Sequence, residues 1–241
     1  MTAIETRDLT KRFGKKTAVD RLNLAIERGE LFALLGVNGA GKSTTIKMLS
    51  CLLRPDGGDA LLLGDSVCTA PQAVKRRIGV SPQDTAVAPN LTVAENLELM
   101  AGVYGAAGPR ERRQRMLAEL GLEGEAKRRA KVLSGGWQRR LSIAMALIAE
   151  PEILFLDEPT LGLDVLARRE LWTVIRGLKG HITIVLTTHY LEEAESLADR
   201  VGVMNAGRLR AVGTPEELKA MAGRGSFEDA FVALAGGEAA S

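Results

Sequence analysis

Two stretches near the start of the chain alternate apolar and polar residues, from Ala3 to Leu9 and from Val19 to Ile26. A period of two puts the apolar side chains on one face of an extended chain, so each stretch is predicted to be a β-strand. The polar segment Lys11 to Lys16 lies between them and favours a turn that joins them as an antiparallel pair. The chain is therefore expected to begin with a small antiparallel β layer.

Three runs further along the chain are apolar at nearly every position: Leu31 to Leu35, Ile153 to Leu156 and Ile182 to Leu186. Such runs are typical of strands that are buried on both faces, as in a parallel sheet flanked by helices. We expect a helix after each run. The sequence therefore predicts an α/β core with a mainly parallel sheet.

The pattern becomes helical between Thr92 and about Ala149, because apolar residues recur there three or four positions apart. Two segments, Gly105 to Pro109 and Gly121 to Gly124, interrupt this pattern with residues that loosen or end helices. The sequence thus predicts a helical lobe that is inserted into the core.

Together these patterns predict one domain of 241 residues with an inserted lobe and a tail. The β layer and the α/β core are expected to occupy residues 1–85 and 150–222, and the helical lobe residues 86–149. The tail, residues 223–241, contains one amphipathic stretch from Phe227 to Leu234 and ends in small residues that are expected to fray.

Composition indicates the class of protein but not its function. Hydrophobic residues make up 46% of the chain and charged residues 26%, which is ordinary for a folded globular protein. The net charge of +2 is too small to indicate nucleic acid as the main partner. Between Arg110 and Arg140, however, ten Lys and Arg residues stand against four Glu. This segment either faces phosphate, lipid headgroups or an acidic partner, or it is a solvated helical face.

Cys51 and Cys68 are too few for a disulfide framework and lack Cys/His metal spacing, so we assign them to packing in a reducing cytoplasm. The first residues lack the basic segment and apolar core of a secretion signal. No apolar run approaches the roughly 20 residues that a membrane-spanning helix needs. We therefore expect a cytoplasmic protein that reaches the membrane only through a partner.

A glycine-rich segment after Leu35 matches the pattern G-x-x-x-x-G-K-[ST] and is predicted to lie between a strand and a helix. Its glycines let backbone N–H groups converge on phosphate oxygens, because no Cβ stands in the way. Lys42 is expected to contact the outer phosphates of ATP and Ser43 a Mg²⁺ ion, while the helix dipole attracts anions. The alternative is a glycine-rich turn without a ligand. The candidate nucleotide-binding residues of this segment are Gly36, Val37, Asn38, Gly39, Ala40, Gly41, Lys42, Ser43 and Thr44.

Two carboxylates, Asp157 and Glu158, follow the buried run Ile153 to Leu156. Open α/β sheets bind their ligands at the C-terminal ends of the strands, so both carboxylates are expected at the site. Asp157 is the candidate to hold Mg²⁺. Glu158, which points in another direction, is the candidate to orient or deprotonate an attacking water. The alternative role of such a pair is to cap the next helix.

The segment Leu133-Ser134-Gly135-Gly136 opens a helix that is predicted to run through Leu147. Ser134 is suited to cap this helix, but two glycines behind a cap favour close approach of the backbone to a phosphate. Here the chain resembles the ATPases of ABC transporters, whose signature begins Leu-Ser-Gly-Gly. The resemblance implies that Ser134, Gly135 and Gly136 bind the γ-phosphate of an ATP held by the opposite subunit.

The resemblance covers nearly the whole chain, with the motifs of the family in order. It implies that Gln83, after the strand expected at Ile78 to Ser81, touches Mg²⁺ and belongs with Glu158 and His189 to the catalytic set. His189 resembles the histidine that contacts the γ-phosphate, although a lone His at a strand end is more often structural. Asp164 is similar to the aspartate that bridges the two subunits.

Phe13 occupies the place of the adenine-stacking aromatic residue of the family, and a Phe ring stacks on a purine as Tyr does. Alternatively it is a turn aromatic that covers the edge of the β layer. Two residues depart from the family pattern: Trp137 replaces the usual glutamine after the glycines, and Leu161 replaces a usual serine. The sequence from Arg139 to Ala144 looks most like the branch that exports drugs, antibiotics and polysaccharides.

The sequence thus predicts a P-loop α/β ATPase with an N-terminal antiparallel β layer and an inserted helical lobe. The resemblance implies an enzyme that binds ATP and Mg²⁺, pairs with a second ATPase subunit and drives a separate membrane permease from the inner face of the membrane. The second subunit is expected to be another copy of the chain, with a different subunit as the alternative. Nucleic acid is not an expected partner. The alternatives are a soluble ABC-type ATPase that acts on ribosomes or DNA, and a P-loop kinase. Against them, the chain holds one uninterrupted cassette and no evident acceptor-binding segment or lid.

Overall fold

The computed structural model describes residues 1–105 and 108–236. Contacts within the chain divide it into two compact units. The first unit comprises Met1–Arg76 and Lys179–Ser241, and the second unit comprises Arg77–Leu178. The boundaries that the sequence suggests for core, lobe and tail stay a prediction. Within the described ranges, no helix combines the length and the apolar character that crossing a membrane requires.

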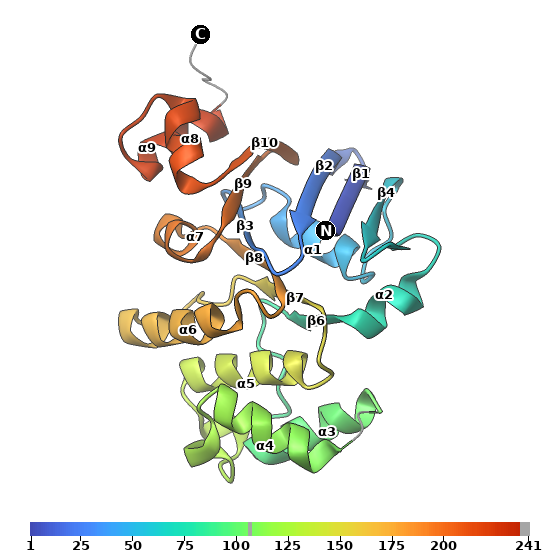
Figure 1. Cartoon of the computed structure of the whole chain (residues 1–241), viewed down its shortest axis with the longest axis vertical. Coiled ribbons are helices and arrows are strands. Elements are labelled where there is room, and N and C mark those ends of the chain that lie inside the picture. The colour runs from blue at the N-terminus through green and yellow to red at the C-terminus, as the bar shows by residue number, and fades with distance from the viewer. Residues whose placement is uncertain (106–107, 237–241) are drawn as a thin grey trace. The chain divides into compact units, whose positions relative to one another are not determined.

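An antiparallel sheet with the strand order β2-β1-β4-β5 opens the first unit (Figure 1). Its strands are β1 (Thr2–Phe13), β2 (Lys16–Glu27), β4 (Gly57–Leu62) and β5 (Asp65–Ser66). In the β1–β2 hairpin, Phe13 pairs with Lys16, so the turn needs only two residues. Gly14, with φ of 56°, supplies the left-handed backbone that such a tight turn requires. The predicted β layer is confirmed, with strands that extend further toward the turn than the alternating pattern does.

The buried strands of the first unit lie in the order β10-β9-β3-β8. They are β3 (Leu31–Leu35), β8 (Thr183–Thr188), β9 (Arg200–Asn205) and β10 (Arg208–Gly213). β3 pairs in parallel with both β8 and β9, whereas β10 pairs antiparallel with β9. Every residue of β3 and β8 is buried, as expected for strands covered on both faces.

Helices complete the first unit. They are α1 (Lys42–Leu49), α2 (Pro71–Arg77, which ends at the boundary), α7 (Leu191–Leu197), α8 (Pro215–Ala222) and α9 (Phe227–Gly236). α8 and α9 lie side by side (Figure 1) and bury Leu218 and Phe227 in one apolar cluster with Leu35 and Val203. The amphipathic stretch in the predicted tail is therefore a packed helix. The small residues 237–241 lie outside the described range.

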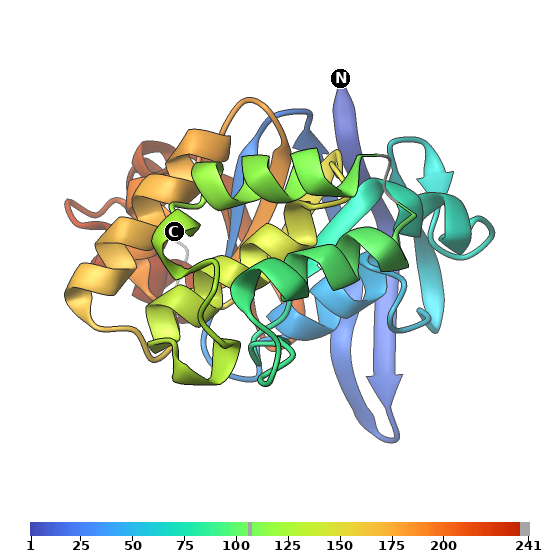
Figure 2. The same cartoon turned by 90° about the horizontal axis from the view of Figure 1, so that it is seen from below.

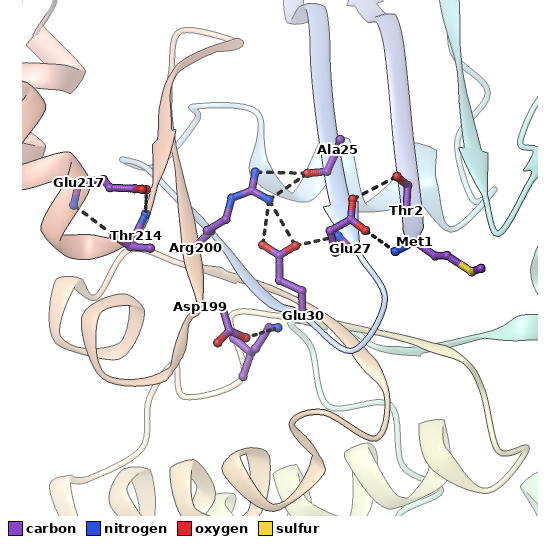
Figure 3. Close-up of polar contacts among 10 residues, drawn as sticks. Met1, Thr2, Ala25, Glu27, Glu30, Asp199, Arg200, Thr214 and Glu217 are labelled. Carbon is purple, nitrogen blue, oxygen red and sulfur yellow. Dashed lines mark hydrogen bonds and ion pairs between the residues drawn. The ribbon is translucent and has the colours of Figure 1, made fainter.

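A polar network surrounds the N-terminal end of β3 (Figure 3), opposite to the end from which the glycine-rich loop leaves. The Arg200 guanidinium on β9 donates to the carbonyl oxygen of Ala25 at 3.3 Å and lies 3.3 Å from Glu30 Oε1. Glu30 Oε2 accepts the backbone N–H of Glu27 at 2.7 Å. Glu30 is only 9% exposed, and its burial raises the pKa of its carboxyl. The network thus ties β2 and β9 to the start of β3.

The second unit contains two parallel strands and a group of helices. β6 (Ile78–Ser81) pairs with β7 (Ile153–Asp157). The helices are α3 (Val93–Val103), α4 (Pro109–Glu119), α5 (Gly135–Leu147) and α6 (Val165–Leu178), with 3-10 turns at Glu123–Glu125 and Ala130–Val132. α3, α4 and α5 pack against one another (Figures 1 and 2). The strands and the helical segment that the sequence predicts in this region are present.

Local signals set the ends of these helices. Thr92 caps α3, because its hydroxyl accepts the N–H of Glu95 at 3.2 Å while the Glu95 carboxylate accepts the N–H of Thr92 at 2.7 Å. Gly108, with φ of 63°, precedes Pro109 at the first position of α4. Gly121, with φ of 64°, follows the end of α4. The two predicted interruptions therefore separate the helices, although residues 106–107 lie outside the described range.

Candidate functional site

The loop between β3 and α1 accepts only glycine at two positions. A Cβ on Gly36 would lie 2.3 Å from the carbonyl oxygen of Met204, and one on Gly41 would lie 2.4 Å from that of Ala18. Gly41 also has φ of 107°, which residues with a Cβ rarely adopt. Both clashes are with backbone atoms rather than with the ends of flexible side chains. The loop is therefore fitted, backbone against backbone, to β2 and β9.

The turn between β9 and β10 fixes this loop from the outside. The N–H of Gly207 donates to the carbonyl oxygen of Ala40 at 3.0 Å, and the carbonyl oxygen of Gly207 accepts the N–H of Asp20 at 2.8 Å. A Cβ on Gly207 would lie 2.9 Å from the carbonyl oxygen of Ala18. Sequence reasoning gave Gly207 and Met204 no role, and only the pairing of distant strands reveals one.

Lys42 opens α1 and is only 4% exposed. Its Nζ donates to the carbonyl oxygen of Gly36 at 2.7 Å and lies 3.3 Å from that of Val37. The first N–H groups of a helix have no acceptor within it, and the helix dipole adds partial positive charge at the same end. The buried ammonium and the helix end therefore make this loop a place where phosphate binds favourably.

The other candidates of this loop differ in exposure. Val37, Asn38 and Gly39 form its exposed outer turn, whereas Ala40 is buried beneath it. Ser43 and Thr44, in the first turn of α1, are half-buried. The structure thus leaves the outer turn accessible to a ligand and holds the inner residues in place.

Phe13 and His189 also belong to the first unit. The Phe13 ring, at the end of β1, is 52% exposed, and Lys11 Nζ lies 5.7 Å from its centre. An aromatic face this open offers more room for stacking than for covering the edge of the β layer. His189 follows β8, and its ring centre lies 4.2 Å from that of Tyr190, whose N–H donates to Thr188 Oγ1 at 3.0 Å.

The two candidate carboxylates lie in the second unit, at the C-terminal end of β7. Asp157 is 5% exposed and Glu158 is 7% exposed. Glu158 has φ of 49°, in the left-handed region that costs a residue with a Cβ about 1–3 kcal/mol. Such a conformation persists only where surrounding contacts fix the backbone. The sequence carries no signal for this strain.

Arg139, in the second turn of α5, supplies such contacts and is only 4% exposed. Its Nη1 donates to the carbonyl oxygen of Pro82 at 2.6 Å, and its Nη2 donates to that of Gln83 at 2.7 Å. Nη2 also lies 3.5 Å from the carbonyl oxygen of Glu158. The side chain of Gln83 itself is exposed. In the sequence Arg139 appears only as a member of the basic segment and as a mark of the family branch.

Ser134, Gly135 and Gly136 form the start of α5. Ser134 stands at the capping position, yet its side chain makes no capping hydrogen bond, and it is exposed. A Cβ on Gly136 would lie 3.2 Å from that of Ala167, so this glycine has a packing reason as well. A Cβ on Gly135 would meet only ordinary contact, 3.6 Å from the side chain of Leu163. Ser134 therefore lacks the side-chain hydrogen bond that a helix cap would make.

Asp164 has a structural role in the second unit. Its Oδ1 accepts the N–H of Ala167 at 2.9 Å, which caps the start of α6. The bridge between subunits that the family resemblance implies for Asp164 stays a prediction. Leu161, the neighbouring departure from the family pattern, is 38% exposed, and its N–H donates to the carbonyl oxygen of Glu158 at 3.2 Å.

Trp137, the other departure, stacks within the second unit. The guanidinium carbon of Arg140 lies 4.7 Å from the centre of its ring. Arg140 Nη2 in turn lies 2.7 Å from Glu170 Oε2 on α6. The indole is therefore held by a cation–π contact that is anchored to the next helix.

Ion pairs use much of the positive charge between Arg110 and Arg140. Arg112 pairs with Glu150 at 2.8 Å, and Arg113 pairs with Glu98 on α3. Further pairs join Arg115 to Glu150, Arg128 to Glu125 and Arg140 to Glu170. The pairs with Glu98 and Glu170 join two helices, those with Glu150 join α4 to the segment after α5, and that with Glu125 is local. Because these residues already have acidic partners, the ion pairs favour the solvated helical face over a basic face that is free to bind a partner.

Comparison with known proteins gives one family. A family model described as "ABC transporter" matches residues 19–161. The Escherichia coli (strain K12) protein named probable multidrug ABC transporter ATP-binding protein YbhF is 43% identical over 242 residues, which cover 97% of this chain and 42% of that protein. The Streptomyces peucetius daunorubicin/doxorubicin resistance ATP-binding protein DrrA is 46% identical over 224 residues, which cover 92% of this chain and 68% of that protein. The chain thus spans less than half the length of the first relative.

Solved structures agree with the sequence comparison. One of them, described as the dimeric post-hydrolysis state of the ATP-binding cassette MJ0796 bound to ADP and Pi, matches with a TM-score of 0.78 and 28% identity. The match covers 88% of this chain and 98% of that chain. The predicted fold class, a P-loop α/β core with an antiparallel β layer and a helical lobe, is confirmed.

Proposed function

The chain belongs to the ABC transporter family of ATP-binding domains, and from that premise we propose that it hydrolyses MgATP to power transport through a separate membrane permease. The observation that carries the proposal is the loop between β3 and α1, in which Gly36 and Gly41 admit no Cβ and Lys42 is buried. Because the chain spans only part of its first relative, the activity, cargo and partners of the whole protein all belong to the proposal.

The loop Gly36–Thr44 holds the phosphates of ATP through its backbone N–H groups and the Lys42 ammonium. Ser43, Gln83 and Asp157 provide a hydroxyl, an amide carbonyl and a carboxylate, and hard oxygen ligands of this kind fit Mg²⁺. The ion, when bound, neutralises charge that develops on the phosphates. The donor chemistry of the three residues supports this assignment.

Hydrolysis requires a group that orients water and accepts a proton from it. Glu158 takes this role, because it follows the Mg²⁺ candidate Asp157 at the end of β7 and its backbone is held in one unusual conformation. His189, at the end of β8, contacts the γ-phosphate. Phe13 stacks on the adenine through its exposed face.

A second copy of the chain completes the site. The chain offers two helix N-terminal ends suited to phosphate, at Lys42 and at Ser134, but only the first has the lysine and a Mg²⁺ ligand. The second end, Ser134 to Gly136, therefore binds the γ-phosphate of ATP held by the partner subunit, with Asp164 bridging the two subunits. The exposed Ser134 hydroxyl, which caps nothing, supports this arrangement.

Export is the direction of transport that we propose. Both relatives are named for multidrug transport or drug resistance, which supports a cargo of small drug-like molecules. ATP binding to the closed pair more strongly than to the open pair is what converts the nucleotide into a switch. The chain acts at the inner face of the membrane through its permease.

The test is MgATP hydrolysis by mixed mutants. Lys42→Ala damages the phosphate loop, and Ser134→Arg blocks the start of α5, so each variant alone is expected to be inactive. Mixing them builds dimers with one intact site and one doubly damaged site, and phosphate release is expected to reappear. Its level follows the mixing ratio, with mixed dimers verified by two different tags.

Two other outcomes count against the proposal. Absence of MgATP hydrolysis by the unaltered chain, with and without a permease, removes the enzymatic role. Hydrolysis by the unaltered chain but no recovery in verified mixed dimers removes the shared site and places the role of Ser134 within its own chain.

A further inference from the structure

Arg139 is a buried cation in a helix whose other buried residues are mainly apolar. Six of those neighbours on α5, from Leu141 to Leu147, are hydrophobic, and Arg139 itself is 4% exposed. Moving a guanidinium out of water costs several kcal/mol in real proteins unless hydrogen bonds replace the lost hydration. A position of this kind needs a reason beyond filling space.

The guanidinium contacts lie on two different loops. Pro82 and Gln83, whose carbonyl oxygens accept at 2.6 and 2.7 Å, follow β6, whereas Glu158, at 3.5 Å, follows β7. These carbonyls lie past the ends of their strands, and that of Glu158 also accepts the N–H of Leu161 at 3.2 Å. The rigid fork of Arg presents several donors in one plane, so a single side chain serves both loops.

Ser142 strengthens the same junction. It lies three residues after Arg139, on the same face of α5, and its hydroxyl lies 2.9 Å from that of Ser81 at the end of β6. Both serines are buried. The start of the loop that carries Gln83 is therefore held to α5 at two points.

The backbone conformation of Glu158 makes its contact with Arg139 important. Its φ of 49° lies in an unfavourable region, so its backbone relaxes unless its surroundings fix it. A displacement of about 1 Å at a reacting group can lower a rate by about 100-fold. The contact of Arg139 with the Glu158 carbonyl, at 3.5 Å, is longer than its contacts with Pro82 and Gln83. Arg139 therefore binds the Gln83 loop more firmly than it binds the Glu158 backbone.

We propose that Arg139 is a positioning residue that sets the Gln83 loop and the Glu158 backbone from the helix that begins at Ser134. This inference rests on the proposed function, which assigns roles to Gln83, Glu158 and Ser134 but none to Arg139. It makes the helix start, the Mg²⁺ candidate loop and the candidate base parts of one assembly within the second unit.

The experiment compares Arg139→Met and Arg139→Lys with Arg128→Met. Arg128 is the matched control, because it belongs to the same unit and also approaches a carbonyl oxygen, that of Val132 at 3.4 Å, but on the exposed surface. Three quantities are measured on the full chain: the kinetics of MgATP hydrolysis, as kcat and KM, the affinity for ATP with Mg²⁺ chelated, and amide hydrogen exchange.

For Arg139→Met we expect kcat to fall about 10- to 100-fold, while ATP affinity and KM stay within about twofold, because the phosphate loop is untouched. Amide exchange is expected to rise together at residues 83–85 and at Glu158, Thr160 and Leu161, since Pro82 and Pro159 have no amide hydrogen. Arg139→Lys, which reaches fewer carbonyls, is expected to restore part of kcat. Arg128→Met is expected to leave all three quantities unchanged.

Equal kcat in Arg139→Met and the unaltered chain overturns the positioning role, as does a loss of kcat matched by an equal loss in ATP affinity. If Arg139→Met fails to fold, Arg139→Lys decides, because normal kcat and exchange in that variant also overturn the role. If the unaltered chain hydrolyses no ATP, the proposed function fails, and the exchange comparison alone still tests whether Arg139 holds both loops.

Discussion

The phosphate loop of the first unit and the carboxylate loops of the second unit are held in different ways. Around Gly36 and Gly41 the fit is backbone against backbone, so an added Cβ would lie 2.3–2.4 Å from a carbonyl oxygen. Around Gln83 and Glu158 a buried side chain takes part in the fit, because Arg139 donates to carbonyl oxygens of both loops. The glycines of the first arrangement form a motif of neighbouring residues in the sequence. The second arrangement involves Arg139, which is more than fifty positions away from Gln83 in the sequence.

The difference has a consequence for mutation. In the first unit the exposed outer turn, Val37 and Asn38, leaves room for different side chains, while Gly36 and Gly41 leave none. In the second unit a Cβ on Gly79, within β6, would likewise lie 2.3 Å from a carbonyl oxygen, that of Ala146. The loops at Gln83 and Glu158 also contact the buried Arg139, and loss of this side chain is expected to loosen both loops. Substitutions in the two units are therefore expected to fail differently.

Lys42→Ala is expected to have the largest effect. Loss of a charge-assisted hydrogen bond to phosphate costs about 1.5–3 kcal/mol, which weakens ATP binding about 10- to 150-fold and abolishes measurable hydrolysis. Calorimetry with ATP measures the affinity. Lys47→Ala, on the exposed face of the same helix, is the control. Unchanged ATP affinity in Lys42→Ala breaks the comparison, because the first unit is then not the part that binds phosphate.

Glu158→Gln is expected to separate binding from chemistry. A general base contributes about 10²–10⁴-fold to a rate, so turnover falls by that factor while ATP affinity survives. ATP is then expected to accumulate in a closed dimer, which size-exclusion chromatography in MgATP detects. Near-normal turnover moves the catalytic role away from Glu158, with His189 the next candidate.

Sequence patterns predicted the strands and helices of both units. They also predicted the glycine-rich loop of the first unit, but not the contacts of Arg139 with the Gln83 and Glu158 loops in the second unit. The apolar run Leu31 to Leu35 and the glycine pattern after it are local, so strand, loop and helix follow from consecutive residues. The clash partners of those glycines, Met204 and Ala18, lie on other strands and become neighbours only in the folded sheet.

The second unit shows the same limit more strongly. An Arg at position 139 looks like one more member of a basic segment, and only its 4% exposure and its carbonyl partners distinguish it. The left-handed backbone of Glu158 also has no sequence signal, since residues of any type with a Cβ avoid that region. Long-range contacts therefore decide what short-range patterns leave open.

Gly36→Ala tests the steric fit between the glycine-rich loop and the backbone of β9. The new Cβ meets a carbonyl oxygen, so the loop or β9 must shift, at a cost of about 1–3 kcal/mol in the free energy of unfolding. Gly39→Ala is the matched change in the same loop, where nothing lies within 4 Å and only the left-handed φ of 81° opposes a Cβ, at about 1 kcal/mol. Urea unfolding of both variants measures the difference. An equal or larger loss in Gly39→Ala contradicts the steric account.

Arg112→Glu with Arg113→Glu tests the ion pairs of the second unit. Each reversal sets a carboxylate against another, Glu150 or Glu98, so the free energy of unfolding is expected to fall by about 1–2 kcal/mol. Basal hydrolysis is expected to stay nearly intact, because both residues lie outside the phosphate motifs. Coupling to a permease is expected to weaken if the packing of α4 matters for docking.

Arg110→Glu with Lys127→Glu is the control for those reversals. Among the described residues, neither Arg110 nor Lys127 has an ion-pair partner, so stability is expected to stay within about 0.5 kcal/mol. A loss of transport with this control pair, and none with the first, restores the reading of a free basic face that meets a partner.

The smallest effect expected is a pH dependence that has opposite signs in the two units. Burial raises the pKa of Glu30 in the first unit above 4.5, so its folded form binds a proton more tightly than its unfolded form. Its contribution to the free energy of unfolding is greatest below about pH 4.5 and falls as pH rises through the raised pKa. The hydrogen bond from Arg115 lowers the pKa of Glu150 in the second unit. Its contribution is present above pH 4.5 and is lost as pH falls through the lowered pKa.

The variants Glu30→Gln and Glu150→Gln separate the pH-dependent contributions of the two carboxyls to the free energy of unfolding. Amide exchange is followed from pH 3.5 to 7.5 and corrected for intrinsic rates. Gln at position 30 keeps an oxygen for the N–H of Glu27, so it removes the titration more than the contact. The protection of β3 in Glu30→Gln relative to the unaltered chain is therefore expected to rise with pH. The protection of α4 in Glu150→Gln is expected to fall below that of the unaltered chain near neutral pH and to converge with it in acid. The same sign of pH dependence in both variants contradicts the contrast, because it means that burial at Glu30 does not outweigh the nearby Arg200.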